Sequence, residues 1–136
     1  MRHRTHNVFD DYVSSTGTMP TTDARYNALL GEHDALALHA ICDNATASTT
    51  VNIHVQHSSE GRQWLYRQNN STNPGTPELS FVLTLATDVK HLMWSDACLG
   101  TTTSGPLLSF VRIAFLVTGG SAHVKLHATQ RGGSAH

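Results

Sequence analysis

The stretch VNIHVQHSSEGRQWLYR, residues 51–67, predicts a β-hairpin and decides the fold class. From Val51 to Gln56 apolar and polar residues alternate strictly, which is the pattern of a strand with one face buried. The SSEG that follows supplies turn residues, and Gly61 can adopt a positive φ. Residues 62–68 then read as the returning strand.

The rest of the chain repeats this short-strand pattern. Further strand-like segments occupy residues 34–42, 79–87, 107–118 and 121–131, and residues 89–100 are ambiguous. Gly119 and Gly120 form a two-residue hairpin turn between the last two segments. Because no convincing amphipathic helix appears, we expect an all-β, two-sheet antiparallel sandwich of seven to eight strands, of jelly-roll type.

The N-terminal segment lacks a sustained period and carries isolated apolar anchors. We therefore divide the chain into an extended, assembly-contacting arm (1–30), the β-sandwich domain (31–131) and a flexible tail (132–136). The anchors assigned to the arm are Phe9, Tyr12, Val13 and Tyr26.

The composition points away from several classes of partner. Charged residues are 14% of the chain, and the formal net charge is −1, so no broad basic field exists to hold nucleic acid beyond weak contacts of the N-terminal tip. No apolar run is long enough to span a membrane, and we expect no secretion signal. With 17 Thr, 12 Ser and only two Lys, the surface favours contact with other protein or is simply that of a Thr-rich β-protein.

The residue types that support catalysis or metal binding do not form a pattern. There are ten histidines, but His123 and His127 lie four apart along one strand, about 13 Å, which is too far to chelate one ion. No GxSxG elbow occurs, and no pair of carboxylates can be nominated. Cys42 and Cys98 pair or remain free, and we favour free thiols. We expect no enzyme, no cofactor and no metal.

Three aromatic residues offer an alternative function. Trp64, Tyr66 and Trp94 would form a glycan-stacking platform if all three rings were exposed on one face of the sandwich. They would instead be core or interface anchors if they were buried.

Two segments carry a family resemblance. Ser58 or Ser59, Glu60, Gly61 and Trp64 resemble the S-x-[DE]-G-x-x-W hairpin of phage and virion structural β-sandwich domains and of some glycan-binding modules. FVRIAFLVTGGSAHVKLHATQR, residues 110–131, resembles the final hairpin of the same domains. The resemblance implies a non-enzymatic sandwich that is built into an assembly or binds glycans, and it carries over no catalytic residue.

These observations lead to one prediction and one alternative. We expect a structural protein that self-assembles into a phage-like shell, tube, fibre or virion component, in a virion or a cytoplasmic assembly. Its partners would be other copies of itself, other structural proteins or surface glycans. Rows of His facing a partner would charge on acidification, so the assembly should weaken below about pH 6. The alternative is a carbohydrate-binding β-sandwich module.

Overall fold

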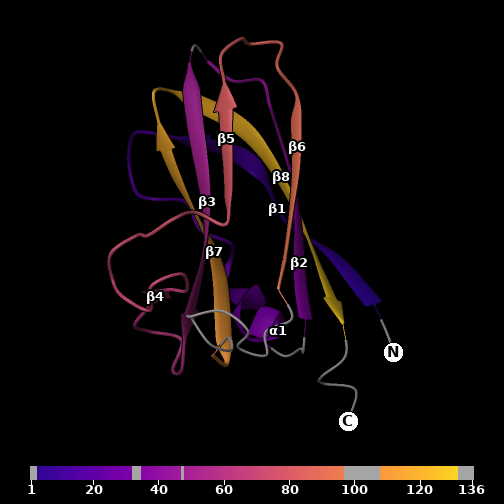
Figure 1. Ribbon diagram of the computed structural model, residues 1–136, viewed down its shortest axis with the longest axis vertical. Helices are drawn as coiled ribbons and strands as arrows, with labels where there is room; N and C mark the ends of the chain where they lie inside the picture. Colours follow the sequence, from indigo (N-terminus) through magenta and orange to yellow (C-terminus); the bar gives the residue numbers. More distant parts are fainter. Residues whose placement is uncertain (1–2, 32–34, 47, 97–107, 132–136) are drawn as a thin grey trace.

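The computed structural model is a sandwich of two antiparallel sheets (Figure 1). It describes residues 3–31, 35–46, 48–96 and 108–131. The first sheet has the order β1-β8-β2-β6, and in the second β3 pairs with β4, β5 and β7. The strands are β1 His3–Ser14, β2 Ala35–Asp43, β3 Thr49–Ser58, β4 Leu65–Tyr66, β5 Leu79–Leu83, β6 Lys90–Asp96, β7 Phe110–Thr118 and β8 Ser121–Arg131. The predicted all-β sandwich is confirmed.

Period-two alternation builds the core between the sheets. β2 alternates between partly exposed and buried side chains along its whole length. On β3 the inward residues Val51, Ile53 and Val55 are fully buried, as the alternation predicted. They meet inward residues of β7 and β8 such as Phe115 and Leu126. Burial of this apolar surface is the main term that favours the folded state.

The N-terminal segment differs from the expectation of an arm. Residues 3–14 form β1, which pairs with β8 along its whole length apart from a bulge between Asn7 and Phe9. The chain then crosses to the other sheet, where Thr21 makes a bridge with Ala114 of β7. The bulge breaks the sequence period, which explains why the pattern hid a strand. Whether the segment contacts another copy stays a prediction.

Two short helical turns and a long loop complete the described chain. Asp23 caps the 3-10 turn η1 (Ala24–Tyr26) by accepting from the Arg25 N–H, and α1 (Asn27–Gly31) follows. The predicted returning strand at 62–68 is only two residues long, because β4 pairs with β3 only at Gln56 and His57. The predicted tail, residues 132–136, lies outside the described residues.

Candidate functional site

The 51–67 hairpin forms the turn that its sequence predicts. Ser58 Oγ accepts hydrogen bonds from the backbone N–H groups of Glu60 and Gly61, at 3.2 Å and 2.9 Å. Gly61 has a φ of +80°, which a side chain would strain. Ser58 and Gly61 therefore shape this turn.

The polar face of β3 meets the chain's own side chains. His54 is only 3% exposed, because the Tyr66 ring lies edge-on to it with the centroids 5.2 Å apart. Gln56 accepts a hydrogen bond from Arg112 at 2.6 Å, and the Arg112 guanidinium lies 4.5 Å from the centroid of the Trp64 ring. The outward direction predicted for His54 is right, but solvent does not reach it. Burial accordingly lowers the pKa of His54.

The predicted glycan platform does not form as one exposed face. Tyr66 is 7% exposed and directs its hydroxyl to Met19 Sδ, 3.7 Å away. Trp64 is half-buried under Arg112. Trp94 lies on the opposite sheet, packs against the core and has the buried Arg67 guanidinium 5.8 Å from its ring centroid. Trp64 and Tyr66 therefore lie together on one sheet, and Trp94 does not join them.

The end of β3 holds a buried polar group that joins three segments. His57 Nε2 donates to Asn70 Oδ1 at 2.8 Å, and His57 Nδ1 accepts from the Leu108 N–H at 3.2 Å. This arrangement requires the neutral ring. Burial lowers the pKa of His57, the hydrogen bond with Asn70 opposes the shift, and the positive charge of Arg67 adds to it. Burial also raises the pKa of neighbouring Glu78.

The four anchors of the predicted arm have different environments. Val13 is fully buried, and Phe9 packs against Phe115 with ring centroids 4.4 Å apart. Tyr26 packs against the core with the Arg25 guanidinium 4.8 Å from its ring centroid. Tyr12 is 58% exposed on the outer face. Of these four side chains, Tyr12 alone is largely exposed and therefore available to a partner.

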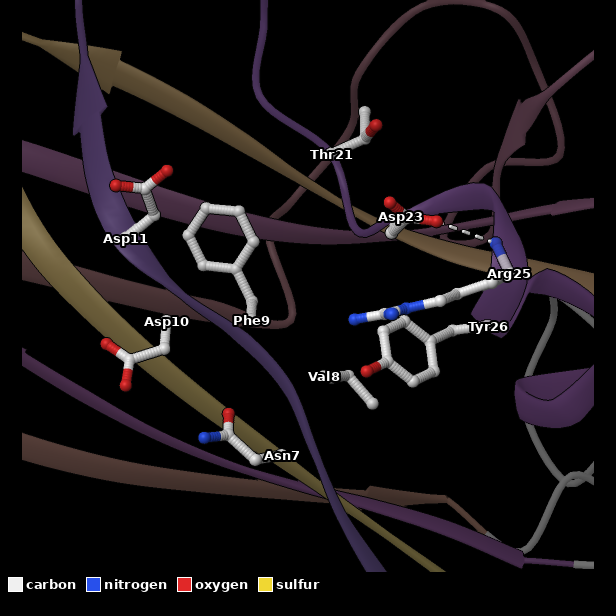
Figure 2. Close-up of a pocket in the computed structure, with 9 residues that line it drawn as sticks. All are labelled: Asn7, Val8, Phe9, Asp10, Asp11, Thr21, Asp23, Arg25 and Tyr26. Carbon is white, nitrogen blue, oxygen red and sulfur yellow. Dashed lines mark hydrogen bonds between the residues drawn. The ribbon is translucent and has the colours of Figure 1, made fainter.

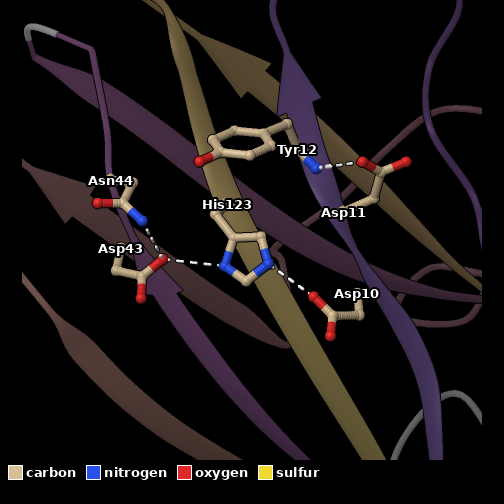
Figure 3. A network of polar contacts seen from close by, with 6 residues as sticks. All are labelled: Asp10, Asp11, Tyr12, Asp43, Asn44 and His123. Atoms are coloured by element: carbon tan, nitrogen blue, oxygen red, sulfur yellow. Dashed lines mark hydrogen bonds and ion pairs between the residues drawn. The ribbon is translucent and has the colours of Figure 1, made fainter.

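An Asp–His–Asp cluster ties three strands together on the outer face of the first sheet (Figure 3). His123 of β8 contacts Asp10 of β1 through Nε2 at 2.6 Å and Asp43 of β2 through Nδ1 at 2.9 Å. Partial burial lowers the pKa of His123, but hydrogen bonds to the two carboxylates outweigh it, so the pKa is raised. When it is protonated, the His123 ring links β1 and β2 to β8 through the two carboxylates.

The same outer face carries a row of three histidines from three strands. His39 of β2 stands directly opposite His127 of β8 in the register, and His91 of β6 lies diagonally across from it. Their rings stack, with centroids 5.6 Å apart for His39 and His91 and 6.1 Å for His39 and His127. The alternation of residues 121–131 predicted an outward direction for His127, but residues 89–100 were ambiguous, and only the sheet order brings the three histidines together.

We call residues 82–93 the β5–β6 edge; they comprise the end of β5, the connecting loop and the first half of β6. Several large apolar side chains are exposed there. Among the residues that the structure describes, each of these strands pairs with a single neighbour and is the last strand of its sheet. Seven large apolar side chains are exposed among the described residues, and five of them lie on this edge: Val82, Leu85, Val89, Leu92 and Met93. Met93 is 73% exposed. The opposite edge of the first sheet, β1, has a bulge and carries Asp10 and Asp11, features that disfavour pairing with another chain.

A polar groove of about 490 Å³ lies between β1 and the segment that crosses to the other sheet (Figure 2). Its lining residues are Asn7, Val8, Phe9, Asp10, Asp11, Thr21, Asp23, Arg25 and Tyr26. In Figure 2 the Arg25 side chain lies across the Tyr26 ring. Sequence reasoning had no signal for this groove, because two separate segments form it.

Three further features concern metal binding, membrane spanning and thiol chemistry in the described parts of the chain. In those residues no group of three or more His, Cys, Asp or Glu side chains is arranged to hold a metal ion. None of the helices described there has the length and apolar character needed to cross a bilayer. Cys42 is a free, buried thiol, and burial, together with the negative charge of Asp43, raises its pKa to about 12. Cys98 lies outside the described residues.

Comparison with known proteins identifies similar folds only. No family model and no curated protein matches the sequence. Among solved structures, BiXyn10A CBM1 in its apo form is 16% identical, with a TM-score of 0.41. The match covers 78% of this chain and 59% of that one, so the chain spans less than two thirds of the length of BiXyn10A CBM1. The CBM22-1 xylan-binding domain of Paenibacillus barcinonensis Xyn10C is 9% identical over 93% of this chain and 92% of its own, with a TM-score of 0.49. A chain in the structure of the infectious bursal disease virus Gx strain is 10% identical in sequence. The match covers 99% of this chain and 34% of that one, also with a TM-score of 0.49. At these scores the likenesses carry no argument about function.

Proposed function

We propose that this chain is a non-enzymatic structural β-sandwich that assembles with copies of itself through the β5–β6 edge. The observation that carries the proposal is the concentration of exposed apolar side chains on residues 82–93. Isolated exposed apolar residues are ordinary on a soluble protein, but five such residues within one strand–loop–strand segment suggest an interface.

Backbone chemistry supports the same surface. Within the described ranges, β5 and β6 have no further strand on their outer sides, so the peptide N–H and C=O groups there would be available to another chain. Along β6, Lys90 is the only charged residue before Asp96. A second copy presenting the same edge would supply matching strands and matching apolar side chains, as two-fold interfaces do.

The test compares charge insertions at the two edges of the sandwich. Purified, tag-free protein is measured by light scattering and sedimentation velocity over a range of concentrations in a buffer with chelator, and by negative-stain imaging. We expect oligomers or particles from the native sequence, and V89K/M93K should disperse them, because lysines at an apolar interface would be buried without partners.

Two matched variants separate the possible contacts. Thr118→Lys adds a charge at an exposed position on β7, which β3 separates from β5, and should leave assembly unchanged. Tyr12→Lys tests the arm predicted from sequence. Dispersal by Tyr12→Lys alone would move the contact to β1, and a monomeric native protein under every condition would refute self-assembly.

A second candidate function, carbohydrate binding, is favoured by the groove beside β1. Its volume lies in the range of small-molecule sites, and its carboxylate and amide groups suit sugar hydroxyls. A glycan array and calorimetry test this function directly. Asp11→Asn and Asp23→Asn should weaken binding at the groove, whereas Glu60→Gln, an exposed carboxylate on the 58–61 turn, should not. Absence of any glycan signal would remove this candidate.

A further inference from the structure

The row of histidines on the outer face contains a pair with the geometry of a metal chelate. His39 lies on β2 and His91 on β6, which is the adjacent edge strand. His39 Nε2 and His91 Nδ1 are 3.4 Å apart, and the two rings are within 28° of parallel. Both nitrogens therefore face the same space from neighbouring strands.

That separation matches the spacing of two ligands on one ion. Zinc–imidazole bonds are about 2.0–2.1 Å long. Two bonds of about 2.05 Å whose nitrogens are 3.4 Å apart meet at roughly 112°, close to the tetrahedral angle. An ion placed there would replace the hydrogen bond that the two rings share. Its remaining positions would be filled by water, since His91 is exposed.

We propose that His39 and His91 form a two-histidine chelate for a borderline divalent transition-metal ion such as Zn²⁺ or Cu²⁺. Imidazole nitrogen suits these ions, whereas Mg²⁺ and Ca²⁺ require oxygen ligands, which this pair does not supply. The ion cross-links β6 to β2 and so stabilises the edge strand that the proposed assembly uses. The chelate is independent of that assembly, because both ligands belong to one copy.

His127 provides an internal control for the chelate. Its ring stacks on the other side of His39, 6.1 Å from it between centroids, and it is not a member of the close nitrogen pair. If the site is a two-histidine chelate, replacing His127 affects metal binding less than replacing His39 or His91. If metal is only attracted nonspecifically to a histidine-rich face, replacing any of the three has the same effect.

The experiment uses the full chain without a polyhistidine tag. Zinc binding is measured by calorimetry, and Cu²⁺ is used for electron paramagnetic resonance, in which coupled nitrogens can be counted. We expect one saturable site and two coupled nitrogens. His39→Gln and His91→Gln should each weaken binding at least about tenfold, because one protein ligand is lost, and His127→Gln should leave the affinity nearly unchanged.

A thermal readout separates the chelate from simple surface binding. Zinc should raise the melting temperature of the native protein in a concentration-dependent way, and Mg²⁺ should not, since only binding to the folded state stabilises it. An equal loss of affinity in all three variants, a single coupled nitrogen, or no saturable site would overturn the proposal. None of these outcomes depends on whether the chain self-assembles.

Discussion

Replacing His57 with leucine tests the buried polar group at the end of β3. Leucine is apolar and of comparable size, so the main change is chemical. The Leu108 N–H loses its acceptor at His57 Nδ1, and Asn70 Oδ1 loses the donor at His57 Nε2. His57 is 2% exposed, whereas Leu108 is 37% exposed and Asn70 is also exposed, so both hydrogen bonds are part-buried.

The expected cost follows from losing two part-buried hydrogen bonds, those to the Leu108 N–H and to Asn70 Oδ1. Each such bond contributes about 0.5–1.5 kcal/mol, so the two together contribute about 1–3 kcal/mol. For a chain of this length, each kcal/mol lowers the melting temperature by roughly 3–5 °C. We therefore expect His57→Leu to melt about 3–15 °C below the native protein, measured by circular dichroism or calorimetry in chelator.

The pH dependence provides a second, more specific readout. Burial holds the pKa of His57 below its ordinary value of 6.5. As the pH falls below 6.5, His57 therefore becomes protonated in the unfolded chain before it does in the folded chain. The stabilisation from neutral His57 is complete above pH 6.5 and falls as the pH drops below it. His57→Leu should flatten this acid-side loss in urea titrations, although His54 keeps part of it because its pKa is also lowered by burial.

A surface substitution serves as the control. His91→Leu changes the same residue type at an exposed position and should alter stability by less than about 0.5 kcal/mol in chelator. If His57→Leu were as stable as the native protein and kept the full acid-side slope, the assignment of His57 as a neutral, hydrogen-bonded link would be wrong.

Three further outcomes are expected. Phe115→Ala should cost about 3–5 kcal/mol in urea unfolding, because the ring is fully buried between the sheets, and a much smaller loss would contradict that packing. His123 stabilises the folded state below pH 6.5, and this stabilisation is lost as the pH rises through the raised pKa of the ring. Asp10→Asn should remove part of it, by less than about 1 kcal/mol because Asp10 is partly exposed. If the free energy of unfolding kept the same dependence on pH on the alkaline side, the result would count against the cluster. In a Cys98→Ser background, Cys42 should resist thiol reagents in the folded protein and react in guanidinium, because burial raises its pKa to about 12; rapid native labelling would show that the thiol is accessible.

Much of the sandwich could be predicted from local patterns. The alternation at residues 51–56 placed Val51 and Ile53 inward, and both are fully buried. The turn at Ser58–Gly61 was readable because positive φ selects glycine. The strand at 3–14 was not predicted, because the bulge between Asn7 and Phe9 shifts the period within it.

The candidate surfaces were less predictable, because each depends on contacts between distant segments. The platform of Trp64, Tyr66 and Trp94 assumed one common face, yet Trp94 belongs to the other sheet. Spacing along β8 excluded His123 and His127 as a chelating pair. It gave no information on pairs from different strands, such as His39 and His91.

The sequence by itself determined which side chains point inward where the alternation is clear, as in residues 51–56, because strand geometry repeats every two residues and needs no knowledge of neighbours. It determined the low charge that excludes a broad basic surface. Only the tertiary structure decided what lies opposite each outward residue, since this depends on strand order and register. That is why His54 is covered by Tyr66, His39 stands beside His91, and the exposed apolar residues gather where β5 and β6 end their sheets.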